Sequence, residues 1–409
     1  MKKNQLIPIR RFKEFVERWD KCKLGCLVNI KAGLPPGAFT MDVNKDGLLY
    51  VKVDDLNSSV REQKDSKSRV LDDKKAFKIN KGSIIFPKRG AAIMTNKVRI
   101  LQYDAYMDTN MMALEPNKIS NEFLYVFILK TSLYEIADTS TIPQINNKHI
   151  EPYIIYTPSI KEQQKIGSFF KVLDERIANQ ERKIAKVKAL KDAYLTEMFP
   201  QEGETVPKRR FKGFEDEWNR KLISEVMDVT SVKRIHQSDW KKEGVRFLRA
   251  RDLVSFYKNE VVEDPIYISK KKYNEYTKAS GKVNTGDLLV SGVGTIGIPY
   301  LIKSKEPVYF KDGNIIWFKN NNYLDGYYLY YYFTTKYLQN YIKIIAGIGT
   351  VGTYTINGGE HTPIYYPSGK EQQKIGEFFK NLDDQIATEE AKLDKLKQTK
   401  EAYLEEMFV

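Results

Sequence analysis

The chain has 409 residues, 42% hydrophobic and 12% aromatic, a composition that favours two or three folded domains and excludes a disordered basic tail. Its 67 Lys and Arg residues exceed its 53 Asp and Glu residues, giving a formal net charge of +14 and favouring a polyanionic partner such as nucleic acid. Its apolar runs are too short to cross a bilayer and its first residues lack an apolar signal core. We therefore expect a cytoplasmic protein without a membrane partner.

The first expected domain covers residues 1–157 and begins with the segment PIRRFKEFVERW at Pro8. Short β-rich runs, including 48–53, 83–87 and 98–101, alternate with turns rich in Gly, Asn and Asp. One aromatic stretch, residues 121–138, has helical length. This pattern predicts an α+β domain.

A long helix is predicted next, over residues 158–199. Ser159 and Glu162 have capping-box spacing, so we expect the hydroxyl and the carboxylate each to accept a backbone N–H. Apolar side chains then follow a heptad, interrupted by Gln180 and Lys191, which predicts a coiled-coil helix of about 57 Å.

The same plan then repeats. A polar linker at 200–206 precedes the segment PKRRFKGFEDEW at Pro207, a second α+β domain over 207–366 and a second helix over 367–409. Residues 158–199 and 367–408 are identical at about 27 of 42 positions without a gap, whereas the domain middles match poorly. Similar ends with different middles indicate one task that both halves share and one that each half performs differently.

The two helices are expected to pair as an antiparallel coiled coil that relates the halves by pseudo-two-fold symmetry. Polar residues at matching seam positions cost stability but fix the register. The predicted seam residues are Ile166, Phe170, Leu173, Ile177, Ile184, Val187, Tyr194, Met198, Ile375, Phe379, Leu382, Ile386, Leu393, Leu396, Tyr403 and Met407.

Motifs for catalysis or metal binding are weak. Gly292–Gly297 matches a dinucleotide fingerprint, but a β-rich run follows it where the motif requires a helix, so a turn or a DNA-facing loop is the better interpretation. Gly347–Gly352 is also in the wrong context. Cys22 and Cys26 lack the further ligands of a structural zinc site. We expect no metal, no catalytic residue and no cofactor in this chain.

Cations with neighbouring amides are the better candidates for function. Lysine and arginine neutralise phosphates, and asparagine and glutamine can read adenine edges. The candidate DNA-binding residues are Lys52, Lys88, Arg89, Gln144, Asn146, Asn147, Lys148, Lys233, Arg234, Arg246, Arg249, Arg251, Thr295 and Thr350.

The chain as a whole resembles the specificity subunit of type I restriction-modification enzymes. The resemblance rests on the doubled Pro-x-x-Arg-Phe-x-x-Phe-x-x-x-Trp segments at Pro8 and Pro207 and on the doubled Lys-Glu-Gln-Gln-Lys-Ile segments at Lys161 and Lys370. Gly294–Gly297 also looks like a loop of this family. The first module departs from the pattern, because Phe86-Pro-Lys-Arg-Gly90 lacks that turn.

The resemblance implies two target recognition domains, roughly 20–157 and 219–366, each reading half of a split site in double-stranded DNA. It further implies that the paired helices set the gap between the half-sites. Two modification subunits would supply S-adenosylmethionine-dependent methylation, and two restriction subunits would supply ATP- and Mg-dependent cleavage. The alternatives are a coiled-coil structural adaptor without DNA sequence specificity, and a self-sufficient nuclease or methyltransferase.

Overall fold

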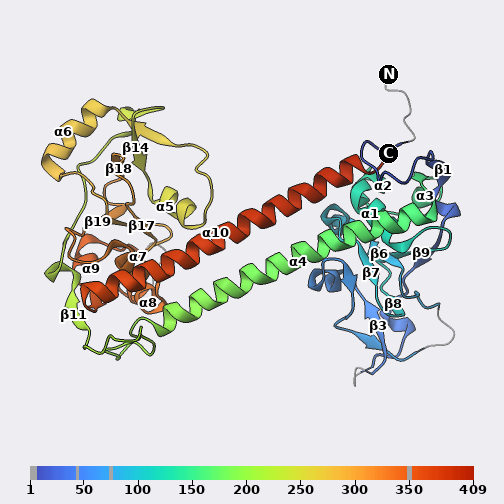
Figure 1. Ribbon diagram of the computed structural model, residues 1–409, viewed down its shortest axis with the longest axis horizontal. Coiled ribbons are helices and arrows are strands. Elements are labelled where there is room, and N and C mark those ends of the chain that lie inside the picture. The colour runs from blue at the N-terminus through green and yellow to red at the C-terminus, as the bar shows by residue number, and fades with distance from the viewer. Residues whose placement is uncertain (1–6, 43–45, 73–76, 348–351) are drawn as a thin grey trace. The chain divides into compact units, whose positions relative to one another are not determined.

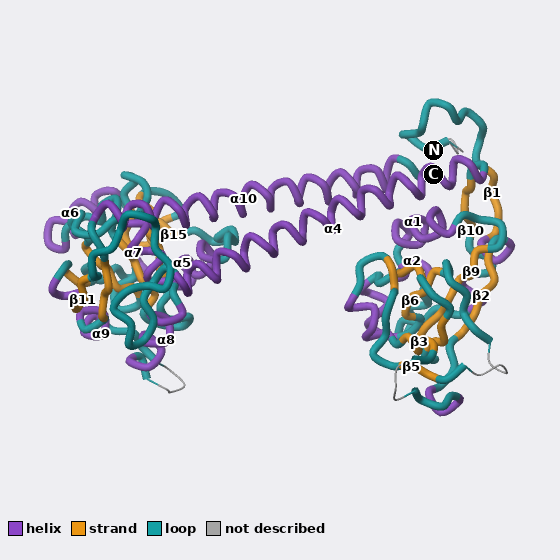
Figure 2. Tube along the Cα trace, turned by 60° about the horizontal axis from the view of Figure 1, so that its bottom comes forward, coloured by secondary structure: helices purple, strands orange, loops and turns teal. Residues whose placement is uncertain are grey.

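The computed structural model describes residues 7–42, 46–72, 77–347 and 352–409 (Figure 1). The chain divides into two compact units: unit 1 contains residues 1–182 and 391–409, and unit 2 contains residues 183–390. Each unit combines small sheets, short helices and one part of each long helix, as the strands and helices of Figure 2 show. The predicted α+β fold with two long helices is confirmed.

Unit 1 is built around β6, the central strand of a five-stranded sheet. All four residues of β6 are buried. Ile84 and Phe86 pack toward the helices, and Ile85 packs toward the second sheet. Burial on both faces explains why this strand is a continuous apolar run. The sheet order is β2 (Val28–Ala32), β9 (Met111–Pro116), β6 (Ile84–Pro87), β7 (Arg99–Leu101) and β4 (Glu62–Gln63).

The rest of unit 1 covers this sheet. In the second sheet, β3 pairs in parallel with β8. In a separate small sheet, β1 pairs antiparallel with β10, the strand that leads into the first long helix. The bounds are β1 (Asp20–Lys23), β3 (Leu48–Val51), β5 (Arg69–Val70), β8 (Ala105–Met107), β10 (Ile154–Thr157), α1 (Asn121–Thr131), α2 (Leu133–Ile136), α3 (Asn147–Ile150), and the 3₁₀ turns Leu24–Cys26, Pro36–Ala38, Val53–Ser58 and Gly90–Thr95.

Unit 2 repeats this plan. Its first sheet has the order β12-β19-β16-β17, with β16 in the position of β6, and its second sheet has the order β13-β15-β14-β18. The parallel pair β14–β18 corresponds to β3–β8, and β11–β20 corresponds to β1–β10. The bounds are β11 (Asn219–Leu222), β12 (Asp228–Thr230), β13 (Trp240–Lys241), β14 (Val245–Leu248), β15 (Ile266–Ile268), β16 (Leu288–Ser291), β17 (Pro299–Leu301), β18 (Val308–Phe310), β19 (Ile315–Lys319) and β20 (Pro363–Tyr366).

The helices of unit 2 include two that have no full-length counterpart. An α-helix, α5, stands where unit 1 has the 3₁₀ turn Val53–Ser58, and α6 follows it. The bounds are α5 (Ala250–Tyr257), α6 (Lys270–Ser280), α7 (Gly326–Thr334), α8 (Lys336–Ile345), α9 (Ile356–Glu360), and the 3₁₀ turns Ile223–Glu225 and Gln237–Asp239.

The long helices α4 (Ile160–Glu197) and α10 (Gly369–Glu406) each have 38 residues, as predicted. In unit 1 the first part of α4 meets the last part of α10, where Lys400 Nζ lies 2.7 Å from Asp174 Oδ1. In unit 2 the last part of α4 meets the first part of α10, where Lys191 Nζ lies 2.5 Å from Asp383 Oδ1. These contacts make the pairing antiparallel, and the two ion pairs occupy matching positions of the repeat.

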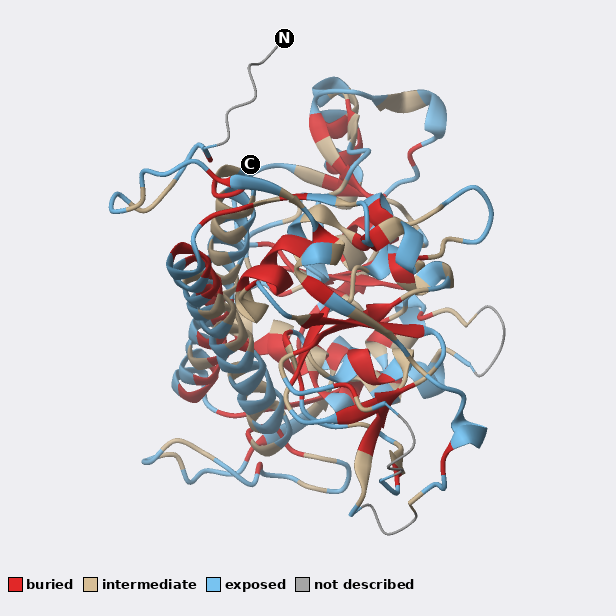
Figure 3. Ribbon diagram, turned by 90° about the vertical axis from the view of Figure 1, so that its right-hand side faces the viewer, coloured by how far each residue is buried: buried red, intermediate tan, exposed pale blue. Residues whose placement is uncertain are grey.

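All sixteen predicted seam residues are buried or half-buried, while many other residues on both helices are exposed (Figure 3). The seam is not a coiled coil along its whole length. Ile166 and Phe170 belong to the core of unit 1 with Phe123, and Ile375 and Phe379 belong to that of unit 2. Among the described residues no helix has both the length and the apolar character needed to cross a membrane.

The predicted capping box at Ser159 is only half right. Glu162 N–H donates to Ser159 Oγ at 3.4 Å, but the Glu162 carboxylate binds Arg11 through two hydrogen bonds of 2.7 Å. Arg210 binds Glu371 in the same two-pronged way, at 2.9 and 2.7 Å. An arginine fork outcompetes the backbone N–H because it brings a full opposite charge. The doubled Arg-Arg-Phe segments thus fasten each module start to a long helix.

Gly167 of α4 lies against α1. A Cβ at this position would lie 2.4 Å from the Glu122 Cβ atom. A Cβ at the matching Gly376 would lie 2.9 Å from the Tyr327 Cβ atom of α7. The two glycines therefore cost helix propensity but allow each long helix to pack tightly on its own unit.

Candidate nucleic-acid interface

In unit 1 the segment after β6 gathers several predicted DNA-binding residues. Ile145 N–H donates to the Lys88 carbonyl at 2.9 Å, and Gly90 N–H donates to the Pro143 carbonyl at 2.8 Å. Arg89 and Gln144 therefore lie opposite each other as an isolated β-bridge. The predicted residues Asn146, Asn147 and Lys148 follow directly, at the start of α3. The structure thus brings together two cations and a run of amides.

Lys88 and Arg89 are the two cations that directly follow β6. In the part of the chain that the structure describes, neither lies within ion-pair distance of an acidic side chain. Lys88 is half-buried, and its pKa is lowered by burial and next by the neighbouring Arg89, with Asp108 acting in the opposite direction. An anion at this loop would relieve that penalty. The predicted Lys52 is half-buried and lies with its Nζ 5.7 Å from the Tyr50 ring centroid.

The loop after β16 occupies the corresponding place in unit 2. Tyr354 N–H donates to the Gly292 carbonyl at 2.9 Å, the counterpart of the bond between Ile145 and Lys88. The two loops are therefore equivalent in the fold despite their different sequences. Gly294 has φ +69°, and the loop leads into β17, so the dinucleotide fingerprint lacks its helix. The predicted Thr295 is exposed in this loop, and Thr350 lies outside the described residues.

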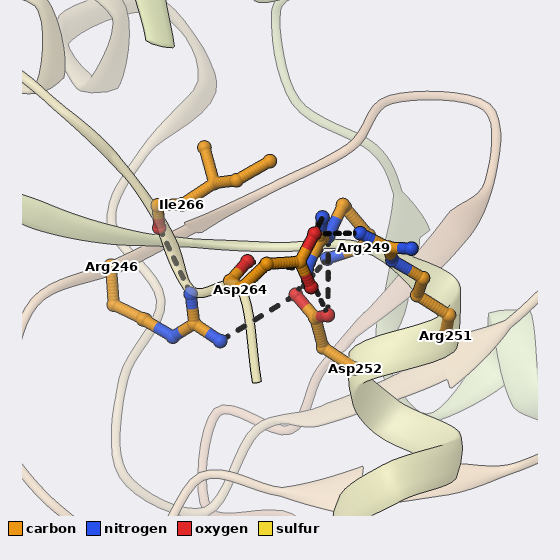
Figure 4. Close-up of polar contacts among 6 residues, drawn as sticks. All are labelled: Arg246, Arg249, Arg251, Asp252, Asp264 and Ile266. Carbon is orange, nitrogen blue, oxygen red and sulfur yellow. Dashed lines mark hydrogen bonds and ion pairs between the residues drawn. The ribbon is translucent and has the colours of Figure 1, made fainter. Parts of the chain in front are cut away.

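The arginines at the start of α5 form an ion-pair cluster with two aspartates (Figure 4). Arg249 Nη2 lies 2.8 Å from Asp252 Oδ1, and Arg249 Nη1 lies 3.1 Å from Asp264 Oδ2. Arg246 donates to the Ile266 carbonyl at 3.0 Å and lies 3.6 Å from Asp252, while Arg251 pairs with Asp264. Hydrogen bonds from Arg249 are the largest cause that lowers the pKa of Asp264.

The predicted cations of unit 2 differ in how far their side chains are exposed. Arg246 and Arg249 are largely enclosed, with side chains 20% and 12% exposed, and their guanidinium groups are used within the chain. Arg251 is 63% exposed. Arg234 is exposed and pairs with Asp312 at 2.8 Å, and Lys233 lies with its Nζ 4.3 Å from the Tyr276 ring centroid. A DNA contact remains a prediction for each of them.

A cavity of about 640 Å³ lies between the start of α5 and the loop after β16. Arg249, Arg251 and Thr295, which the sequence indicated, line it. It also contains polar residues that sequence reasoning missed: Gln237, Lys311 and Asn314. The only signal for the last two was the turn Lys-Asp-Gly-Asn, which is common in loops of any function. The cavity lining combines cations and amides with apolar side chains such as Val254 and Val293.

Sequence comparison finds two copies of one family, described as the type I restriction modification DNA specificity domain, at residues 16–189 and 215–398. The type I restriction enzyme MjaVIII specificity subunit of Methanocaldococcus jannaschii is 24% identical, over 94% of this chain and 90% of its own length. The MjaIX specificity subunit of the same organism is 27% identical over 46% of this chain and 44% of its own length.

Solved structures share the fold at low sequence identity. The S subunit of a type I restriction-modification system from M. genitalium aligns with a TM-score of 0.60 and 17% identity, covering 98% of this chain and 99% of its own. A chain from a structure on complex assembly and conformational transition of the type I R-M system aligns with a TM-score of 0.58 and 16% identity, covering 95% and 97%. At these identities the likeness concerns the fold.

Proposed function

The chain belongs to the family of the type I restriction modification DNA specificity domain, and we propose that it reads a bipartite site in double-stranded DNA, one half with each unit. One observation carries this proposal. The loops after β6 and β16 hold the same place in the two units but present different chemistry, Lys88 and Arg89 in one and Gly292 to Thr295 in the other. Equivalent position with different side chains suits two readers of different half-sites.

The long helices suit a spacer role in this proposal. Each has 38 residues and the two pair antiparallel, with ion pairs at matching positions of the repeat. Two readers on one face of a duplex need centres separated by about 34–36 Å or a multiple. We propose that the helix pair fixes this separation and hence the number of base pairs between the half-sites.

In this proposal, methylation and cleavage of DNA are carried out by partner subunits. We propose that this chain is not itself an enzyme and acts in the cytoplasm. Two modification subunits would supply methylation with S-adenosylmethionine, and two restriction subunits would supply cleavage with ATP and Mg. The repeat supports paired docking, because the segments starting at Lys161 and Lys370 give two copies of one partner matching surfaces.

Exchange of one recognition domain tests the proposal. Residues 20–157 are replaced by the same region of a relative, and the complex with its modification subunits is used to select sites from randomised duplexes. We expect only one half of the selected site to change, because unit 2 is untouched. A change in both halves, or in neither, would contradict the proposal that each unit recognises one half-site.

Salt dependence tests the structural adaptor as the alternative. A chain that neutralises phosphates with lysine and arginine binds DNA with an affinity that falls linearly in log salt. Association that does not depend on salt, together with no preference for any duplex, would favour the adaptor. Activity of the purified chain alone, abolished by a single carboxylate substitution, would favour a self-sufficient enzyme.

A further inference from the structure

Arg251 and Asp264 form an exposed pair of opposite hydrogen-bonding character in unit 2. Their side chains are 63% and 65% exposed, and Arg251 Nη2 donates to Asp264 Oδ2. A guanidinium has five N–H donors and a carboxylate has about four acceptor sites. Arg249 and Arg251 together occupy three of the acceptor sites of Asp264, so the pair keeps several free donors on Arg251 beside one free acceptor site on Asp264 Oδ1 (Figure 4).

The surroundings favour a base edge over a phosphate as the ligand of this pair. Arg251 lines the 640 Å³ cavity described above, and it also lines a second hollow, which contains the buried Asp252 and three exposed carboxylates, those of Glu260, Glu263 and Asp264. Three carboxylates at one hollow repel a phosphate, whereas the edges of base pairs carry no net charge. The acidic rim thus selects against non-specific backbone contacts at this point.

Arg249 has a different task from Arg251. It lies between the two aspartates: its Nε and Nη2 bind the buried Asp252, and its Nη2 also donates to the Asp264 carbonyl at 2.9 Å. Asp252 is 1% exposed. With most of its donors used and 12% of its side chain exposed, Arg249 links a rigid buried carboxylate to the exposed one. It is a positioning residue for Asp264.

We propose that Arg251 and Asp264 together read one guanine–cytosine pair in the major groove of the half-site bound by unit 2. Arg251 donates to guanine O6 and N7, and Asp264 accepts from the cytosine N4 amino group, the two contacts that these side chains make best. Asp252 and Arg249 hold Asp264 in place. This inference rests on the proposed function and adds the base pair and the residues that select it.

Selection from randomised duplexes, with the full chain in complex with its modification subunits, tests the inference. For the wild type we expect one position in one half-site that requires a guanine–cytosine pair. Arg251→Ala should weaken that preference about 5- to 150-fold, the range for loss of a bidentate contact to guanine, and leave the other half-site unchanged. Lys278→Ala, an exposed lysine of α6 in the same unit, is the matched control and should change nothing.

Asp264→Asn tests the acceptor while keeping the size of the side chain. We expect relaxed selection at the same position. We also expect non-specific binding that falls more steeply with log salt, by about 0.9 in slope, because the released Arg251 can then neutralise one phosphate. Arg249→Met should relax selection at that position too, whereas a purely structural loss would lower the unfolding midpoint without changing base preference.

The possible failures are distinguishable. A wild-type chain that selects no sequence overturns the proposed function and this inference with it. A wild type that selects a bipartite site without a guanine–cytosine requirement overturns this inference alone. An Arg251→Ala chain that keeps full selection, or that loses affinity equally for all sequences as a phosphate contact would, also overturns it.

Discussion

At the scale of single residues, Lys88 shows how the fold prepares a cation for an anion. Burial and the adjacent Arg89 lower its pKa, so the free protein carries an ammonium group that is poorly solvated and poorly compensated. A phosphate beside it stabilises the charged form and raises its pKa. We therefore predict that a DNA contact by Lys88 is coupled to proton uptake at alkaline pH.

This coupling predicts a pH dependence. Between the lowered pKa of the free protein and the higher pKa of the complex, binding takes up a proton, so affinity should fall as pH rises through that window. Lys88→Arg should remove this decline, because arginine stays protonated. Fluorescence anisotropy of a labelled duplex, at pH values rising from about 8 to the ordinary lysine pKa of about 10.4, measures it. Lys148→Arg is the matched control, and the same decline in wild type and Lys88→Arg would exclude a Lys88 contact.

Residue identity alone does not reveal which cations are available. The sequence offers four such candidates: Lys88, Arg89, Arg249 and Arg251. In the structure, Arg249 forms ion pairs with Asp252 and Asp264. Lys88 and Arg89 form no ion pair with a carboxylate among the described residues. Asp264 reaches Arg249 because it lies beside β15, which pairs with β14. That pairing has no signature in the sequence, so the ion pairs could not be predicted.

At the scale of elements, the two arginine forks explain the repeated module starts. Glu162 and Glu371 are each 1% exposed, and Arg11 and Arg210 neutralise them with paired hydrogen bonds. Removing one partner of a buried ion pair leaves an uncompensated charge, which costs about 3–5 kcal/mol. The forks are therefore structural, whatever else the module starts do.

Arg11→Ala should accordingly destabilise unit 1 by about 3–5 kcal/mol. Urea unfolding of the full chain measures the loss, and Arg210→Ala is the matched change in unit 2. The double variant Arg11→Ala with Glu162→Gln should recover part of it, because the buried charge is then gone. Equal stability of Arg11→Ala and the wild type would show that Glu162 is satisfied in another way.

The long helices were the most predictable elements because their signal is local and repeated many times. The heptad gave their length and buried face. It did not show that Ile166 and Ile375 belong to domain cores, or that Asp174 and Asp383 would bind the seam lysines. Those contacts depend on neighbours far away in sequence.

At the scale of the whole molecule, the duplication could be detected from the sequence because one half of the chain can be aligned with the other. It predicted two modules with similar ends and different middles, and both units share one strand plan. The departure at α5, an α-helix where unit 1 has a 3₁₀ turn, was not predicted, because eight residues are too few for periodicity to distinguish a helix from a strand. The proposed function needs both units and the long helices that they share.

Shortening the helix pair tests this account most directly. Deleting residues 179–185 and 388–394 removes one heptad from matching segments of α4 and α10 and keeps the ion pairs of Lys400 and Lys191. Seven residues of helix correspond to about 10.5 Å, or about three base pairs of duplex. Site selection from duplexes randomised in sequence and spacer should return the same two half-sites with a different spacer length between them. An unchanged spacer would show that the helix pair does not set the distance.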